Sequence, residues 1–198
     1  MTTRASTWWV LLSAATAPVL LIGGWTVAAT QQRHGFAPMQ DTISALAALE
    51  ARDRWIMTSA LYGLGVCHVL TAWGLRPAAT RGRGVLAFGG LCTLFVASLP
   101  LSKMGSPNAH LTAATGAFVS LATWPLFAFE RTPETPTWLR PKISVAAAAV
   151  LLALLGALEL SLRRQSYVGL SERTAAGAQA LWPLVVAFAT RPRPRDAL

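Results

Sequence analysis

Glu159 is the residue whose surroundings best suit acid–base chemistry in this sequence. It lies within the apolar run Leu154–Leu160, near the end of a long hydrophobic stretch. An ionisable group inside lipid is costly, so it is a functional candidate by default. Without a partner, a carboxyl among leucine side chains favours its neutral form, as a proton donor requires. The alternative is an ion pair with Arg163 on the next helical turn, or with Arg173.

A second carboxyl and a phenol complete the candidate catalytic set. Asp41 follows Pro38 and suits a helix N-cap, but it can also act as an acid or base at the mouth of a cavity. Tyr62 shares one face of a predicted helix with Ser59 and Trp55. That face indicates either a second acid–base group or an interfacial aromatic belt with ordinary packing.

Aromatic side chains form the candidate binding surface. The chain has 8 tryptophans, and an aromatic face stabilises a cation by about 0.5–2 kcal/mol. The same tryptophans can instead mark the membrane interface or fill the bundle interior. The predicted substrate-binding residues are Trp55, Trp25, Trp124, Trp182, His110 and Arg173.

Histidine and cysteine spacing argues against a metal centre. His68 and His110 are predicted at different depths, and neither an HxxxH nor a CxxC spacing occurs. Cys67 and Cys92 fall in apolar runs and are interpreted as packing residues. We therefore expect no metal and no cofactor. A Ser–His nucleophile pair stays open, although no nucleophile-elbow pattern supports it.

A membrane-embedded helical bundle must position these residues. The composition is 54% hydrophobic and 13% charged, whereas a soluble domain is about 25% charged. Because a spanning helix needs about 20 apolar residues, we predict an all-α domain over residues 1–190, followed by a basic Pro-rich tail over 191–198. Its six predicted transmembrane helices are Trp8–Ala29, Trp55–Leu75, Gly84–Leu101, His110–Phe129, Ile143–Leu162 and Leu170–Thr190.

The net charge of +9 lies beside the apolar runs. A nucleic-acid-binding protein would instead gather such charge on one face of a soluble fold, so we expect no nucleic-acid partner. With the N-terminus inside, 10 of the 17 Lys and Arg residues fall in the inner segments. The positive-inside rule therefore predicts that both termini are cytoplasmic.

The longest predicted connection, Thr30 to Arg54, contains a short amphipathic helix. Asp41 is its predicted N-cap, and the helix continues to Glu50. We expect it either to lie at the outer membrane interface or to tuck between the spanning helices. Long ordered connections often carry function.

Several of these segments together resemble a known family. In chain order they are Asp41-Thr42-Ile43-Ser44-Ala45-Leu46, Arg54-Trp55, His110, Gly169-Leu170-Ser171-Glu172-Arg173 and Leu181-Trp182. Over nearly the whole chain the pattern resembles the bacterial integral membrane proteins catalogued as domain of unknown function 998. The resemblance implies a multi-helix fold in the bacterial cytoplasmic membrane, and it implies no particular activity.

Three functions fit these features. The favoured one is an intramembrane enzyme in which Glu159 protonates a lipid-soluble, isoprenoid or prenylated substrate and Asp41 or Tyr62 removes the final proton. In size and composition the chain is similar to small membrane-embedded terpene cyclases, which are lyases or isomerases, without a motif match. The alternatives are a lipid-handling or transport protein without catalysis, whose partner is a membrane lipid, and a structural membrane subunit. The sequence predicts no oligomeric state.

Overall fold

Six long helices dominate the computed structural model, which describes residues 7–32, 35–102, 104, 106–133 and 135–191. No strand occurs in these ranges, so the predicted all-helical class is confirmed. Apart from Arg191, the predicted basic tail lies outside them. The long helices are α1 (Trp8–Gln31), α3 (Trp55–Gly74), α4 (Thr80–Ser98), α5 (Asn108–Ala128), α6 (Pro141–Arg164) and α7 (Val168–Ala189), with the short helix α2 (Ile43–Leu46) and the 3-10 turn η1 (Thr137–Leu139) between them.

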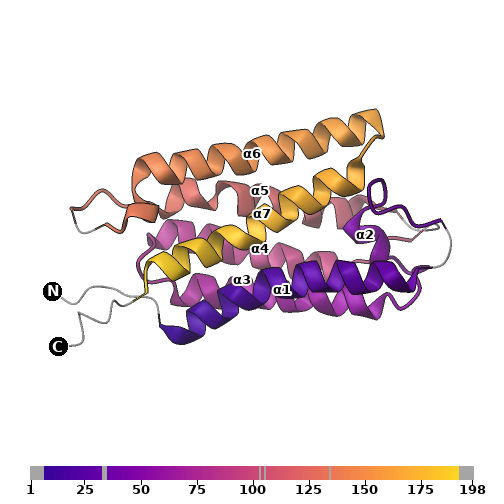
Figure 1. Ribbon diagram of the computed structural model, residues 1–198, viewed down its shortest axis with the longest axis horizontal. Helices are drawn as coiled ribbons and strands as arrows, with labels where there is room; N and C mark the ends of the chain where they lie inside the picture. Colours follow the sequence, from indigo (N-terminus) through magenta and orange to yellow (C-terminus); the bar gives the residue numbers. More distant parts are fainter. Residues whose placement is uncertain (1–6, 33–34, 103, 105, 134, 192–198) are drawn as a thin grey trace.

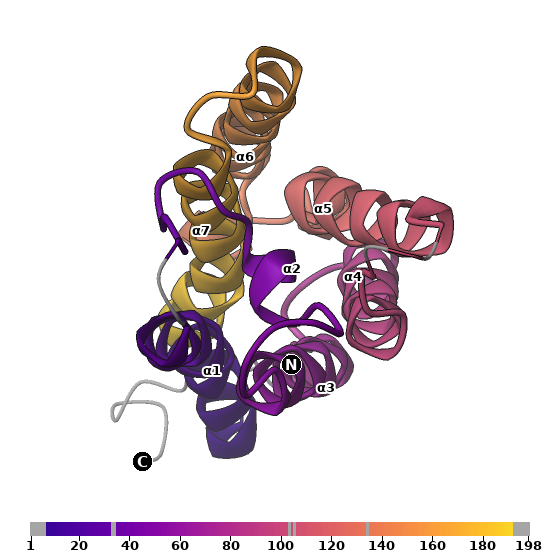
Figure 2. The same cartoon turned by 90° about the vertical axis from the view of Figure 1, so that its right-hand side faces the viewer.

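The long helices alternate in direction and form a closed ring. Around this ring α1 packs on α3, α3 on α4, α4 on α5, α5 on α6, α6 on α7, and α7 back on α1. Figure 1 shows the helices side by side, with α2 at the end of the bundle opposite the start of α1 and the end of α7. Viewed from that end, α2 lies inside the ring (Figure 2). We call this end the lid end, and residues 35–52 the lid.

The surface of the bundle is apolar in the way that a membrane requires. Four helices, α1, α3, α5 and α6, are long and apolar enough to cross a bilayer. The most apolar of them, α6, is also the least buried, which reverses the pattern of a soluble protein. Large apolar side chains such as Val19, Phe88 and Val150 point outward in mid-helix. The predicted membrane protein with transmembrane helices is therefore supported.

The two remaining long helices, α4 and α7, are more polar. They have 19 and 22 residues, close to the lengths of the four apolar helices. The first turn of α4 contains Arg81 and Arg83, whereas α7 contains Glu172 and Arg173 near its start. These charges lie at helix ends and leave the middle of each helix without a charged residue.

Glycines bring neighbouring helix backbones close together. A methyl group at Gly90 of α4 would lie 2.8 Å from the carbonyl oxygen of Gly65 on α3. One at Gly82 would overlap with the backbone of Ala128, where α5 ends. Helices in lipid associate through such close packing because no hydrophobic effect drives them together.

Replacing Gly82 with alanine therefore tests the packing of α4 on α5. The backbone of Ala128 cannot move aside, so we expect Gly82→Ala to lower the free energy of unfolding by about 1–3 kcal/mol. Gly84 lies on the same helix with no atom near its missing side chain. Gly84→Ala should leave stability unchanged or raise it by up to about 1 kcal/mol. Thermal unfolding of both variants in one detergent checks this, and equal effects would contradict it.

Candidate functional site

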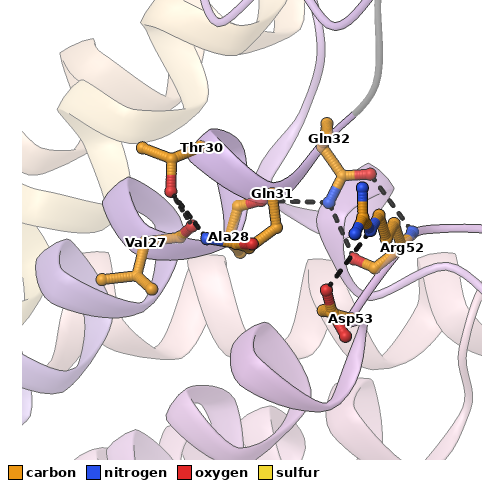
Figure 3. Close-up of polar contacts among 7 residues, drawn as sticks. All are labelled: Val27, Ala28, Thr30, Gln31, Gln32, Arg52 and Asp53. Carbon is orange, nitrogen blue, oxygen red and sulfur yellow. Dashed lines mark hydrogen bonds and ion pairs between the residues drawn. The ribbon is translucent and has the colours of Figure 1, made fainter.

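The last residue of the lid, Arg52, is tied to the end of α1. The side-chain amide of Gln32 donates to the carbonyl of Arg52 at 2.9 Å and accepts from the backbone N–H of Arg52 at 3.2 Å. Figure 3 shows this two-way contact beside the last turn of α1, with the Arg52 side chain turned toward Asp53. The same amide also donates to the carbonyl of Ala28. Gln32 thus fixes the end of the lid against the last turn of α1.

The lid and α7 cap each other. Glu172 on α7 accepts a hydrogen bond from the backbone N–H of Ile43, the first residue of α2, at 2.5 Å. In return, the N–H of Gly169 in the first turn of α7 donates to the carbonyl of Gln40 at 3.1 Å. Helix ends leave such backbone groups without partners, and apolar surroundings make an unpaired group costly. Each element therefore satisfies the exposed helix end of the other.

Arg173 completes this junction from the side. Its Nη1 donates to the carbonyls of Pro38 and Asp41, both at 2.8 Å, and its guanidinium lies 5.8 Å from the ring centre of Phe36. The approach is so close that a side chain at Gly169 would overlap with the carbonyl oxygen of Asp41. Arg173, which the sequence suggested as a substrate-binding residue, therefore holds the lid in place.

The predicted lid helix exists, but its cap and length were wrong. Thr42, and not Asp41, caps α2, because its Oγ1 accepts from the N–H of Ala45 at 3.1 Å. The Asp41 carboxylate instead accepts from the N–H of Ala37 at 2.6 Å and closes the preceding turn. The helix ends at Leu46, well before Glu50, and Leu46 is completely buried. The helix was expected either at the membrane interface or between the spanning helices. The structure has the second placement, because α2 lies inside the ring of long helices.

A chain of two hydrogen bonds joins α2 to α5 and to the end of α4. Nδ1 of His110 lies 2.7 Å from the carbonyl oxygen of Leu99, and Nε2 lies 3.1 Å from Oγ of Ser44. A carbonyl only accepts, so Nδ1 must carry the ring hydrogen of a neutral imidazole. Nε2 is then an acceptor facing the Ser44 hydroxyl. His110 itself is only 4% exposed.

A lateral pocket of about 510 Å³ opens between α5 and α6. Its walls are mainly apolar and include Phe118 and Val119 of α5 and Leu152 and Leu155 of α6. Its polar lining at the lid end is Thr42, Ser44, His110, Glu172 and, on α6, Glu159. The pocket therefore joins a hydrocarbon-like surface to a small set of groups that can transfer protons.

A smaller inner cavity of about 60 Å³ lies deeper in the ring. Ser44 and Glu172 line both hollows, whereas His68 and Gln179 line only the inner cavity. Both ring nitrogens of His68 and Oε1 of Gln179 are buried without a hydrogen-bond partner among the described residues. Buried polar groups usually find such a partner, frequently a water. The volume is enough for about four waters.

Glu159 forms the ion pair with Arg163 that was the alternative to a catalytic role. Its carboxylate accepts from Nε of Arg163 at 2.7 Å, one helical turn away, and its side chain is 57% exposed. An ionised and paired carboxylate lacks the proton that a donor needs. Glu159 does line the lateral pocket, so its catalytic role stays a prediction, but the dry and unpaired setting expected for it is absent.

The structure scatters most of the other predicted site residues. Tyr62 contacts Ser98 at 3.0 Å on the exposed side of α3, and Trp55 is exposed at the start of that helix. Within the described chain, neither hollow has a tryptophan in its lining. Trp124 is fully buried in the half of the bundle away from the lid, Trp25 packs against the lid-end core, and Trp182 stacks edge-on against Trp138. Only His110 and Glu159 of the predicted set line the lateral pocket.

Neither Ser44 nor Glu172 was among the predicted catalytic or substrate-binding residues. A signal for Glu172 was present, because it precedes Gln179 by seven residues and thus lies on the same face of α7. Two polar residues on one otherwise small and apolar face indicate a polar interior. No local pattern singles out Ser44, whose partner His110 is 66 residues away.

Comparison with known proteins gives one match. Residues 14–189 match the family described as "protein of unknown function (DUF998)", so the chain belongs to that family. No curated protein and no solved structure gives a significant match. Three of the segments on which the family resemblance was noted, residues 41–46, His110 and residues 169–173, meet at the lid end.

Removing the guanidinium of Arg173 should loosen the lid. Hydrogen bonds from charged groups contribute about 1.5–3 kcal/mol. We therefore expect Arg173→Met to speed amide hydrogen exchange over residues 37–46 by about tenfold or more. Arg163→Met, which breaks only an exposed ion pair, is the matched control and should leave these residues unaffected. Unchanged exchange in Arg173→Met would show that this side chain does not hold the lid.

Proposed function

We propose that this DUF998 protein is an intramembrane enzyme that transfers protons to and from a lipid-soluble substrate. One observation carries the proposal. A hydroxyl from α2, an imidazole from α5 and a carboxyl from α7 gather at the lid end of an apolar pocket, although they are far apart in sequence. Intramembrane ionisable groups are costly to maintain and mark functional sites.

The lateral pocket fits a lipid-soluble substrate. Its volume of about 510 Å³ lies within the ~300–1,000 Å³ typical of small-molecule sites. It opens between α5 and α6, and α6 is the least buried of the four most apolar helices. A substrate dissolved in the membrane can therefore enter sideways, with its apolar part along Phe118 and Leu155 and its reactive group toward Ser44 and His110.

Glu172 takes the role that the sequence suggested for Glu159. Its carboxyl accepts from the backbone N–H groups of Ile43 and Ser44 at the start of α2. These contacts hold it at the boundary of the two hollows, where it can exchange a proton with a bound substrate. Proton transfer by a positioned side chain contributes about 10²–10⁴-fold to a rate. Unlike Glu159, Glu172 is buried and lies between the lateral pocket and the inner cavity.

An isoprenoid substrate remains one form of this proposal. The apolar walls suit a prenyl chain, and cyclisation begun by protonation would need only the carboxyl of Glu172. Stabilising a carbocation, however, normally requires aromatic faces, and Phe118 is the aromatic residue of the described chain that lines both hollows. Terpene cyclase-like activity is therefore a narrower proposal than proton transfer on a lipid.

We further propose that all six long helices cross the cytoplasmic membrane, with both termini in the cytoplasm. In the ring, α4 separates the apolar helices α3 and α5, and α7 separates α6 and α1. A ring in which neighbours run in opposite directions needs every member to traverse the same thickness. The excess of Lys and Arg beside the end that holds the termini favours the cytoplasm there.

A lipid-handling protein without catalysis is the second candidate. The sideways opening of the pocket and its polar lining also suit the transient binding of a lipid head group near the lid end. The two functions differ in chemistry. Vesicles containing the protein would redistribute a labelled lipid between leaflets without altering its mass if handling were the function.

Changing Glu172 to glutamine separates proton transfer from folding. The amide oxygen of Glu172→Gln can still accept from Ile43, but the side chain cannot donate or take up a proton. In vesicles of bacterial lipid extract supplemented with prenylated lipids, we expect mass spectrometry to show at least one lipid class converted by the wild type. Turnover by Glu172→Gln should fall by about 100-fold or more. Glu130→Gln, which changes an exposed carboxyl that lines neither hollow, is the matched control and should stay within about twofold.

Two results would contradict the proposal. One is wild-type turnover in a folded Glu172→Gln protein. The other is the absence of any altered lipid with the wild type, in which case leaflet redistribution would favour the handling function.

Reporter fusions test the topology. A fluorescent protein that matures only in the cytoplasm should fluoresce when fused after Arg191, and a phosphatase that folds only outside should be active when inserted after Gln165. If neither reporter is active at its expected position, the orientation of the bundle in the membrane is the opposite of the one proposed. Phosphatase activity at both positions would show that α7 does not span the membrane.

A further inference from the structure

We propose that Ser44 is a nucleophile that accepts the acyl group of a lipid carboxylic ester. The inference rests on the proposed function and gives its substrate class and reaction. It arises from the contacts of Ser44, which belongs to a four-residue helix held inside the ring. Ser44 was not among the predicted catalytic residues.

The hydroxyl of Ser44 is placed as an activated serine must be. Its Oγ lies 3.1 Å from Nε2 of His110, and Nδ1 of the same ring lies 2.7 Å from the carbonyl of Leu99. The carbonyl fixes the tautomer that leaves Nε2 free to take the serine proton. A nucleophile held by a base, which a third group orients in turn, is the arrangement used by serine hydrolases on unrelated folds.

The same residue faces the space that an ester would occupy. Ser44 lines the lateral pocket, whose apolar walls along α5 and α6 can hold an acyl chain. Thr42 lines this pocket as well. Its hydroxyl oxygen accepts from Ala45, which leaves its hydrogen available to an oxygen that gains negative charge.

The first half of the reaction forms an acyl-enzyme. Oγ of Ser44 attacks the ester carbonyl carbon while its proton passes to Nε2 of His110. The bond between that carbon and the alcohol oxygen then breaks, and Glu172, which starts the cycle protonated in this scheme, donates its proton to the departing oxygen. The products of this half are an acyl-serine, the free alcohol, an imidazolium and a carboxylate.

Water from the inner cavity completes the reaction. Glu172 and Ser44 line this cavity too, and the unpaired polar groups of His68 and Gln179 are suited to hold waters in it. The oxygen of a water bonds to the acyl carbon while the Glu172 carboxylate takes a proton from that water. The bond between the acyl carbon and Oγ of Ser44 then breaks, and the imidazolium of His110 returns a proton to Oγ. The sum is one ester and one water converted to a fatty acid and an alcohol, with every residue restored.

A purely structural contact is the competing explanation for the Ser44–His110 bond, since it also holds α2 against α5. A structural serine is unreactive, whereas an activated one attacks phosphorus. Labelling by an alkyl fluorophosphonate therefore separates the two explanations without knowledge of the natural ester. Oγ forms a bond to phosphorus, fluoride leaves, and the base takes the hydroxyl proton.

The experiment treats the full-length protein in lipid vesicles with an alkyl fluorophosphonate and maps the adduct by mass spectrometry. We expect labelling at Ser44, none at that site in Ser44→Ala, and a rate at least about 100-fold lower in His110→Gln. Ser98→Ala removes another helical hydroxyl with a side-chain partner and should not change labelling. If His110→Gln does not fold, labelling of the wild type at Ser44 and its loss in folded Ser44→Ala still decide the proposal.

Failure to label Ser44 in the folded protein would overturn the proposal, as would an unchanged rate in folded His110→Gln. The outcome is independent of the lipid-turnover test. Glu172-dependent turnover without Ser44 labelling would leave an acid–base enzyme of another kind. Ser44 labelling without lipid turnover would leave a reactive serine and remove the proposed function.

Discussion

The junction between the lid and α7 depends on one constraint: backbone polar groups at helix ends must find partners where water is scarce. Glu172 satisfies the start of α2, the carbonyls of the lid satisfy the start of α7, and Arg173 satisfies two further lid carbonyls. Because each partner completes the other, neither segment can move alone without exposing unpaired groups. The absence of a side chain at Gly169 makes the close approach possible.

The position of the lid then determines what the bundle can do. A segment held inside the ring brings Ser44 against His110, and His110 is in turn fixed by the end of α4. The ring packs tightly at its glycine crossings but leaves a lateral pocket between α5 and α6 and an inner cavity beneath the lid. Polar groups with proton-transfer chemistry thus lie between a surface suited to hydrocarbon and a space suited to water. An ester lipid and a water molecule require these two environments.

The sequence predicted the helices but not the meeting of Ser44, His110 and Glu172 at the lid end, for physical reasons. Apolar length and charge placement are local signals, so the long helices and the short helix after α1 were visible. The carboxyl of Glu159 looked isolated because apolar residues surround it in sequence, yet a helix turns Arg163 onto the same face. Tryptophan abundance indicated a binding surface, but the ring directs Trp55 outward and Trp124 into the far core. Ser44 and His110 meet only through the packing of three elements, which no spacing rule encodes.

Photo-crosslinking tests most directly whether the lateral pocket accepts a lipid chain. A phospholipid with a diazirine on its acyl chain, mixed into vesicles with the protein, should react mainly with Phe118, Val119 and Leu155 on the walls of the pocket. Gly156 borders the pocket and has open space at its missing side chain, so Gly156→Trp should fill the pocket and suppress these crosslinks. The account would be contradicted by crosslinks spread evenly over outward positions such as Val19 and Phe88, unaffected by the tryptophan.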